Sequence, residues 1–213
     1  MSEQPSFWDG KHTKFIAKNG PNGPSFFVQK IASSLPSNSK VLELGCGYGQ
    51  DAVYLARMGH HVVATDISHI ALAQLPEEAN DLDVETLLLD TRNLPYPFQA
   101  ESFDIVYAHL SLHYFSAQLT RQIFSEIARI LCVNGRLLSL FNSIKDAENG
   151  SGAQLEPGYY ELSSGDRKRF FSAEEMPSLL PPPLAIELAE YGTGTVNNKD
   201  DQFLIIIATK SLT

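Results

Sequence analysis

The fold is decided by the stretch Val41-Leu42-Glu43-Leu44-Gly45-Cys46-Gly47-Tyr48-Gly49-Gln50-Asp51. An apolar run that contains an acid is followed by glycines at alternate positions and then by a typical helix start. We expect a buried strand that ends at Leu44, a tight glycine turn, and a helix that begins near Gln50. Glycine is needed where the backbone adopts positive φ or touches a ligand closely, and the free N–H groups of a helix N-terminus bind polar groups. The stretch therefore predicts a nucleotide-type cofactor site in an α/β sheet.

The spacing of these glycines distinguishes between classes of cofactor. The dinucleotide fingerprint is G-x-G-x-x-G, but here the third glycine, Gly49, comes one position early and Gln50 stands where that fingerprint has glycine. The stretch resembles motif I of the class I S-adenosylmethionine (SAM)-dependent methyltransferases, in which a strand ends in D/E-x-G-x-G-x-G. The resemblance extends over most of the chain.

The resemblance implies a cofactor site with defined contacts. In the family, the acid before the loop contacts the methionine amino group, directly or through water, and the glycines let the backbone approach the cofactor. The implied cofactor-binding residues of this chain are Glu43, Gly45, Cys46, Gly47, Asp66, Ile67, Asp90, Thr91, His109 and Trp8. The implied cofactor is SAM, and the implied product is S-adenosylhomocysteine (SAH).

Two acids, Asp66 and Asp90, end expected strands, and each either binds the cofactor or has a structural role. Asp66 ends the strand expected at 61–66, where a carboxylate can accept both ribose hydroxyls of a nucleoside; otherwise it is an exposed acid that caps the next helix. In the family, an acid at the end of the third strand, here Asp90, often accepts a hydrogen bond from the adenine amino group, helped by the next backbone N–H, here that of Thr91. An ordinary loop acid is the alternative for Asp90. Ile67 lies either beside the adenine ring or in the core.

Strand and helix patterns alternate along the chain. The expected strands cover residues 41–44, 61–66, 84–90, 103–108, 136–141, 185–191 and 203–209. A helix capped by Ser116 is expected between the fourth and fifth strands and closed by Gly135. Alternation of this kind predicts a parallel sheet covered by helices on both faces. We expect one Rossmann-like α/β domain over residues 1–213, a mainly parallel seven-stranded sheet with a terminal antiparallel strand.

Two segments without a regular pattern are expected to cover the site. Residues 1–23 are predicted to form an arm or lid and not a regular element. Trp8, His12 and Phe15 in this segment could close over the cofactor. An aromatic anchor in the core is the alternative for Trp8. Residues 142–171 have weak periodicity and several glycines, and a long irregular stretch in a compact domain is often a functional lid. We expect this second segment on the acceptor side.

Two histidines follow the expected fourth strand. His109 and His113 are candidate catalytic bases, because imidazole takes up a proton near neutral pH. In the family, residues at this point border the methionine end of SAM and the acceptor, which favours a lining role for His109. A structural role is the alternative for both. Their i, i+4 spacing would also suit a metal pair, but no third ligand is evident, so no metal site is expected.

Composition limits the class of partner. A net charge of −9 over 213 residues argues against a nucleic-acid partner bound through a broad basic surface. No apolar run approaches the roughly 20 residues of a membrane span, and residues 1–5 lack the pattern of a secretory signal. Cys46 and Cys132 are the two cysteines, which favours a reducing cytoplasm over a disulfide framework.

Absent signatures narrow the expected acceptor. Residues 108–111 lack the Asp/Asn-Pro-Pro-aromatic signature of enzymes that methylate amino groups of nucleic acids, and neither cysteine follows a proline, as the nucleophile of cytosine-C5 enzymes does. The chain loosely resembles bacterial small-molecule methyltransferases of the tellurite-resistance and thiopurine groups, partly through Arg169-Phe170-Phe171-Ser172. We therefore expect methyl transfer to a small acceptor by in-line displacement, governed by positioning. The alternatives are a non-catalytic SAM-binding protein, a macromolecular methyltransferase and a nicotinamide-dependent oxidoreductase.

Overall fold

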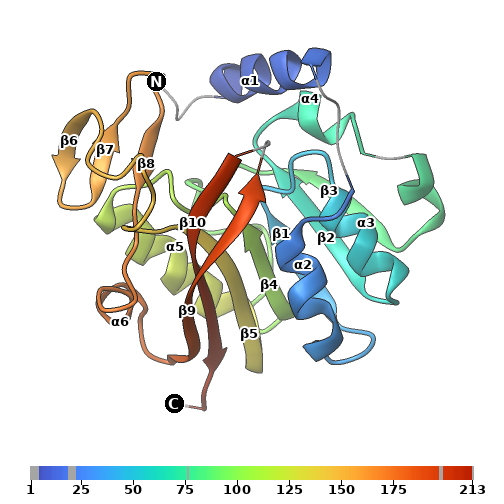
Figure 1. Ribbon diagram of the computed structural model, residues 1–213. Coiled ribbons are helices and arrows are strands. Elements are labelled where there is room, and N and C mark those ends of the chain that lie inside the picture. Colours follow the sequence, from blue (N-terminus) through green and yellow to red (C-terminus); the bar gives the residue numbers. More distant parts are fainter. Residues whose placement is uncertain (1–4, 19–22, 76, 197–198, 213) are drawn as a thin grey trace.

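A seven-stranded sheet forms the centre of the molecule, in the strand order β3-β2-β1-β4-β5-β10-β9 (Figure 1). The computed structural model describes residues 5–18, 23–75, 77–196 and 199–212. The strands are β1 (Lys40–Leu44), β2 (His61–Asp66), β3 (Val84–Leu88), β4 (Phe103–His109), β5 (Leu131–Asn142), β9 (Leu184–Val196) and β10 (Lys199–Lys210). The first five run parallel, and β10 is antiparallel to both β5 and β9. The predicted mainly parallel sheet with antiparallel pairing at one end is confirmed.

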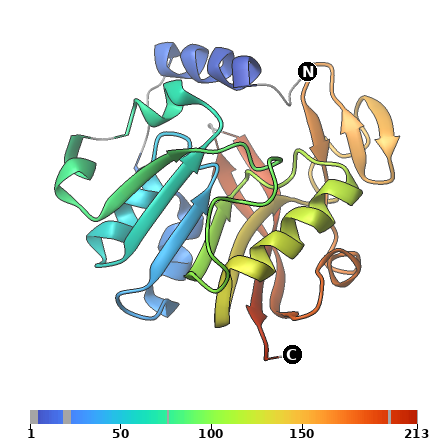
Figure 2. The same cartoon turned by 180° about the vertical axis from the view of Figure 1, so that it is seen from behind.

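Helices cover both faces of this sheet. They are α1 (Pro5–Lys18), α2 (Phe26–Ile31), α3 (Gln50–Arg57), α4 (His69–Leu72), α5 (Ala117–Ile130) and α6 (Met176–Leu179), with short 3-10 turns at Ala32–Ser34 and Glu77–Asp81. Successive β1 residues enter separate cores: Val41 packs with α2 and α3, and Leu42 packs with α5 and α6. The view from behind in Figure 2 brings α5 to the front. Within the described ranges, no helix is long and apolar enough to cross a membrane.

The N-terminal segment differs from the expectation of an irregular arm, because residues 5–18 form the helix α1. Its apolar periodicity is weak, so the sequence alone gave no signal for a helix. Contacts with other segments supply the missing stabilisation: Asp9 accepts a hydrogen bond from the Ser68 hydroxyl at the start of α4, and Lys11 pairs with Asp166. Tertiary contacts of this kind commonly decide whether a marginal helix forms.

The second irregular segment, 142–171, also contains regular structure. Three short antiparallel strands, β6 (Ala153–Glu156), β7 (Tyr159–Glu161) and β8 (Arg167–Arg169), form what we call the small sheet. Strands of three or four residues are too short for an alternating pattern to be recognised. Phe171 joins the small sheet to the main sheet, because its N–H donates to the Asn142 carbonyl at 2.9 Å.

Helix boundaries follow local chemistry at most positions. The Ser116 hydroxyl accepts from the Leu119 N–H at 3.3 Å and caps α5 as expected. The expected end of α5 at Gly135 is wrong, because α5 ends at Ile130 and β5 begins at the next residue. A Cβ on Gly135 would lie 2.8 Å from the Cys132 carbonyl oxygen. Gly135 is therefore needed for close packing of backbones at the start of β5, not to terminate a helix.

A leucine pair tests the placement of the core. Leu204 on β10 is completely buried, whereas Leu88 on the edge strand β3 is 59% exposed. We expect Leu204→Ala to lower the free energy of unfolding by about 2–5 kcal/mol and Leu88→Ala to change it by about 0.5 kcal/mol or less. Urea denaturation of both variants measures the difference. Equal losses would contradict the assignment of the core to both faces of β10 and its neighbours.

Candidate functional site

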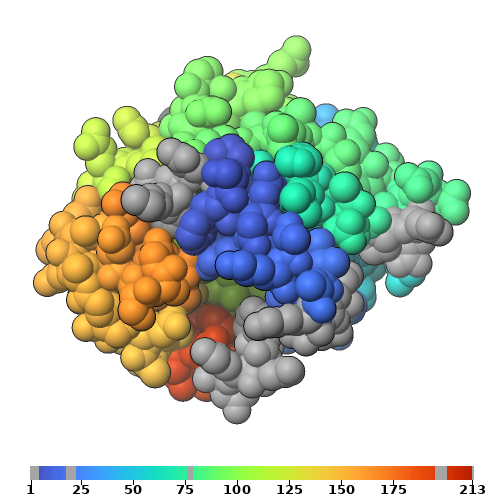
Figure 3. All heavy atoms as spheres, turned by 90° about the horizontal axis from the view of Figure 1, so that it is seen from above, coloured from blue at the N-terminus to red at the C-terminus, as the bar shows by residue number. Residues whose placement is uncertain are grey.

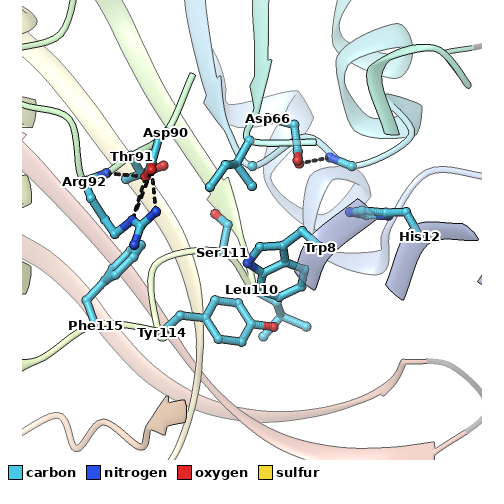
Figure 4. Close-up of a pocket in the computed structure, with 13 residues that line it drawn as sticks. Trp8, His12, Asp66, Asp90, Thr91, Arg92, Leu110, Ser111, Tyr114 and Phe115 are labelled. Carbon is cyan, nitrogen blue, oxygen red and sulfur yellow. Dashed lines mark hydrogen bonds and ion pairs between the residues drawn. The ribbon is translucent and has the colours of Figure 1, made fainter. Parts of the chain in front are cut away.

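A cleft of about 770 Å³, partly open to solvent, lies at the carboxyl ends of the central strands. It is lined by Trp8, His12, Gly45, Gly47, Asp66, Ile67, Asp90, Thr91, Arg92, Leu110, Ser111, Tyr114 and Phe115 (Figure 4). The cleft lies where the strand order reverses, since β1 pairs with β2 on one side and with β4 on the other. Ligands of open α/β sheets bind at such switch points.

The glycine loop forms the floor of the cleft through unusually close packing. Gly45 has a φ of +73°, and a Cβ there would lie 2.4 Å from the Ser111 Cβ. The Ser111 hydroxyl donates to the Leu44 carbonyl, so the end of β1 is joined to the segment after β4. Gly49, also at +73°, is the N-cap of α3, as the sequence predicts. Glycine at position 45 thus permits the close approach of Ser111, and glycine at position 49 leaves room for the Leu75 side chain.

Asp66 is held at the cleft by backbone donors. Its Oδ2 accepts from the Gly47 N–H at 2.9 Å, and its Oδ1 accepts from the Ser68 N–H at 2.8 Å. Burial raises the pKa of this carboxyl, while these backbone hydrogen bonds oppose the rise. Ile67 follows on the lining. The carboxylate is thereby fixed in orientation beside the glycine loop.

Asp90 and Thr91 lie on the lining together with Arg92, which the sequence did not single out. The Arg92 guanidinium donates hydrogen bonds to both oxygens of the Asp90 carboxylate, from Nε to Oδ1 at 2.9 Å and from Nη2 to Oδ2 at 2.5 Å. The Arg92 backbone N–H also donates to Oδ1 at 3.0 Å. The Asp90 side chain is therefore oriented by its own loop, as Figure 4 shows.

Glu43 is a buried acid with an unsatisfied oxygen. Its side chain is on β1 next to the cleft floor, and its Oε2 has no hydrogen-bond partner among the described residues. Burial raises the pKa of Glu43 well above its usual range, and the charges of Asp51 and Asp66 raise it further. A buried polar atom without a partner costs free energy until a ligand or water satisfies it. The unsatisfied Oε2 of Glu43 can therefore accept a hydrogen bond from a ligand, and the neighbouring acids favour a donor that carries positive charge.

The next acid along the chain, Asp51, has a structural role. Its Oδ1 accepts from the Ser25 N–H at 2.7 Å, and its Oδ2 accepts from the Tyr107 hydroxyl at 2.6 Å. These bonds join the start of α2 to the start of α3 and to β4. Asp51 therefore joins two helices beside Glu43.

The two candidate histidines, His109 at the end of β4 and His113 after it, are not on the lining of the cleft. His109 packs against Phe26 and Phe27 at ring distances of 6.3 and 6.4 Å, and burial lowers its pKa. His113 is 2% exposed, and burial together with the nearby charge of Lys168 lowers its pKa well below the usual value. Its Nδ1 has no partner among the described residues. Both imidazoles are therefore neutral near pH 7, and their proposed roles as bases are not supported by contact with the cleft.

The helix α1 lies across the opening of the cleft, between the small sheet and α4 (Figure 3). Trp8 and His12 face inward on the lining, and the Trp8 ring meets the Tyr114 ring edge-on at 4.8 Å. The Tyr48 hydroxyl of the glycine loop donates to the His12 carbonyl at 3.3 Å, and Phe15 stacks on Tyr48 at 5.4 Å. Of the three aromatic residues expected to close over the site, Trp8 and His12 thus line the cleft and Phe15 packs on the glycine loop.

The structure brings together most, but not all, of the residues expected from the sequence. Seven of them line the cleft, namely Trp8, Gly45, Gly47, Asp66, Ile67, Asp90 and Thr91, whereas Glu43, Cys46 and His109 are not on its lining. Burial raises the pKa of the Cys46 thiol well above its usual value. Arg92, Ser111, Tyr114 and Phe115 were missed; their signal was only a position just after an expected strand. Among the described residues, no three His, Cys, Asp or Glu side chains form a group suited to a metal ion.

Comparison with known proteins shows what the domain is similar to. Residues 41–135 match the family described as a methyltransferase domain. A sarcosine/dimethylglycine N-methyltransferase of Aphanothece halophytica is 27% identical over 164 residues, which are 70% of this chain and 57% of that protein. TehB of Haemophilus influenzae, a probable SAM-dependent methyltransferase, is 38% identical over 61 residues, 28% of this chain and 21% of that protein. The chain spans little more than half the length of the first curated relatives it matches.

Solved structures agree on the fold. The crystal structure of Haemophilus influenzae TehB has a TM-score of 0.69 at 18% identity and covers 94% of this chain and 67% of that chain. A Burkholderia thailandensis 1,6-didemethyltoxoflavin-N1-methyltransferase, solved with 1,6-didemethyltoxoflavin and SAH bound, has a TM-score of 0.63 at 21% identity, covering 86% of this chain and 76% of that chain. Residues 41–135 thus match a methyltransferase domain family, the solved structures share the fold, and the resemblance to the class I methyltransferases expected from the sequence is confirmed.

The contact between Gly45 and Ser111 is testable with a matched glycine. Gly45→Ala and Gly59→Ala both place a side chain at positive φ, at a cost of roughly 1–2 kcal/mol, but a Cβ on Gly59 meets no atom within 4 Å. We expect Gly45→Ala to destabilise more than Gly59→Ala, because its Cβ overlaps that of Ser111. The double variant Gly45→Ala/Ser111→Gly removes the overlapping atom and should recover part of the loss. Equal effects of the two single variants in urea denaturation would disprove the close approach.

Burial of His113 predicts a dependence of stability on pH. Because its folded pKa is lowered, the unfolded chain binds a proton near pH 6.5 that the folded protein rejects, so stability is lost as pH falls below about 6.5. Relative to His113→Gln, the wild type should lose up to roughly 1.4 kcal/mol per pH unit in that window. Urea denaturation from about pH 8 to about pH 5 measures both curves. Parallel curves would show that His113 is not buried in neutral form.

Proposed function

We propose that this protein transfers a methyl group from SAM to a small-molecule acceptor. The observation that carries the proposal is the unsatisfied carboxyl of Glu43, which is buried near Asp51 and Asp66 and comes two residues before Gly45 of the cleft lining. Three carboxyl groups favour a ligand with positive charge, and SAM carries both a sulfonium and an ammonium group. The anionic pyrophosphate of a dinucleotide would be repelled by the same groups, which argues against nicotinamide chemistry.

The described residues fit SAM at each end. We assign the unsatisfied Oε2 of Glu43 to the methionine amino group and the open backbone of Gly45 and Gly47 to close approach. Asp66 is assigned to the ribose hydroxyls: each of its oxygens accepts one backbone N–H, and a carboxylate offers about four acceptor sites. The carboxylate therefore keeps acceptor capacity for the ribose hydroxyls.

The adenine end requires an adjustment to the expected contacts. Arg92 donates four hydrogen bonds to the Asp90 carboxylate, which uses the acceptor sites that an adenine amino group would need. We propose that adenine lies beside Ile67 and the Thr91 backbone. Asp90 then accepts a hydrogen bond from the adenine amino group after one hydrogen bond from the Arg92 guanidinium to Asp90 is broken. Trp8 covers the cofactor from α1.

SAM supplies an already activated methyl group, so the protein's contribution is positioning and exclusion of water. Alignment of two reactants can supply about 7–11 kcal/mol in the best-oriented reactions. We propose that α1 and the small sheet are the lids that provide this exclusion, with the single domain of residues 1–213 acting as one unit. Because neither His109 nor His113 lines the cleft, we assign no catalytic base.

Three observations support a small acceptor and a cytoplasmic location. Two of the similar proteins are, by name, enzymes that act on small molecules, one on sarcosine and dimethylglycine and one on 1,6-didemethyltoxoflavin. The net charge of −9 disfavours a nucleic-acid acceptor. Cys46 and Cys132 are both free thiols, which fits a reducing compartment.

Thermal unfolding with SAH tests the cofactor, and a pair of aspartates makes the test specific. SAH at about 100 times its dissociation constant should add about 2.7 kcal/mol, a rise in Tm of roughly 5–10 °C for this size, whereas NADH should give none. Asp66→Ala should weaken SAH by about 1.5–3 kcal/mol, because it removes charged hydrogen bonds to the ribose. Asp104→Ala is the control, since Asp104 bonds only the Lys40 N–H among the contacts described and lies at the opposite end of the sheet.

Each alternative has its own result. A rise in Tm with NADH alone would overturn the proposal in favour of a nicotinamide enzyme. Equal SAH affinity in a folded Asp66→Ala variant would remove the ribose assignment. Catalysis is then measured as release of SAH from SAM with a panel of small amines, thiols and hydroxyl compounds. Binding of SAH without turnover across the panel would identify a non-catalytic SAM-binding protein.

A further inference from the structure

The segment that follows β4 is held by groups from the small sheet. Three consecutive backbone carbonyls of this segment each accept a hydrogen bond from a residue of the small sheet. The His113 carbonyl accepts from the Arg169 N–H at 2.7 Å, and the Phe115 carbonyl accepts from Arg169 Nε at 3.1 Å. Between them, the Tyr114 carbonyl accepts from the Tyr159 hydroxyl at 3.0 Å. Two residues of the small sheet therefore fix three successive peptide units.

Arg169 is the centre of this arrangement. Its side chain is only 1% exposed, and its planar fork reaches acceptors on several sides. Nη1 donates to the Pro157 carbonyl at 3.1 Å, and Nη2 pairs with the Glu156 carboxylate. The same Glu156 carboxylate accepts from the Ala117 N–H at 2.9 Å, at the N-terminus of α5. Arg169 thus links the small sheet, the segment after β4 and the start of α5.

The segment needs this external support. Leu110, at its start, has a φ of +53°, a strained conformation for a residue with a side chain. Such strain persists only where surrounding contacts impose it. The side chains of Tyr114 and Phe115 form part of the cleft lining, so the position of their backbone sets the shape of that wall.

We propose that Arg169 and Tyr159 are positioning residues that set the wall of the cofactor cleft from outside it. Both lie beyond residues 41–135, the range that matches the methyltransferase domain family. The small sheet is then a determinant of ligand affinity as well as a cover, and this part of the inference rests on the proposed function. The other part, that Arg169 and Tyr159 hold the wall in position, does not depend on the proposed function.

Trp8 provides a direct readout, because it is the single tryptophan of the chain and its ring contacts Tyr114 at 4.8 Å. Arg169→Met removes the guanidinium, and Tyr159→Phe removes one hydroxyl while keeping the ring that packs 5.3 Å from the Arg169 guanidinium. In both variants we expect a red shift of Trp8 emission without ligand and SAH binding about tenfold weaker or more, the equivalent of about one hydrogen bond. Arg136→Met is the matched control, since Arg136 bonds Glu187 and the Ser34 carbonyl instead of the cleft wall.

The control separates positioning from general loss of stability. If Arg136→Met lowers Tm but leaves Trp8 emission and SAH affinity unchanged, while the two small-sheet variants change both, the inference is supported. If the variants lower Tm as the control does and leave emission and affinity unchanged, it is overturned. Should Arg169→Met fail to fold, Tyr159→Phe decides. Should the wild type not bind SAH, the proposed function fails, and Trp8 emission still decides the position of the wall.

Discussion

The cleft depends on the close contact between Gly45 and Ser111. A Cβ on Gly45 would come within 2.4 Å of the Ser111 Cβ, and the Ser111 hydroxyl bonds the Leu44 carbonyl. This contact joins the ends of two neighbouring parallel strands at the point where the order of the sheet reverses. The backbone of the loop then faces the cleft without side chains in the way, which leaves its N–H groups and the adjacent acids available to a ligand.

The buried acids beside the glycine loop give the cleft a preference for a ligand with positive charge. Glu43 is buried with one oxygen unsatisfied, and its pKa is raised by burial and by the neighbouring charges of Asp51 and Asp66. Asp51 remains in place because Ser25 and Tyr107 donate to it. A cationic ligand would relieve the repulsion among these acids and satisfy the free oxygen, which is the physical basis of our preference for SAM over a dinucleotide.

The main sheet could be predicted because its signals are local and strong. The strand at 61–66 contains an apolar run at 62–64 and ends in an acid, and Ser116 caps α5 by a bond within the same turn. The predictions failed where packing between distant segments decides the structure. Residues 5–18 become the helix α1 through the contacts of Asp9 with Ser68 before α4 and of Lys11 with Asp166 between β7 and β8. Gly135 serves a close approach of backbones and does not end a helix.

For the site, the sequence by itself determined the glycine loop and the acids Glu43, Asp66 and Asp90, because each has a fixed position relative to the end of its own strand. Tertiary structure alone decided which side chains face the cleft. It directed His109 and His113 away from the lining, paired Asp90 with Arg92, and brought Trp8 against Tyr114. It also placed Arg169 behind the wall of the cleft, although that residue lies far along the chain. The physical reason is the range of the interactions: turn geometry and capping act within a few residues, whereas burial, ion pairing and the support of loop carbonyls depend on segments that meet only in the folded chain.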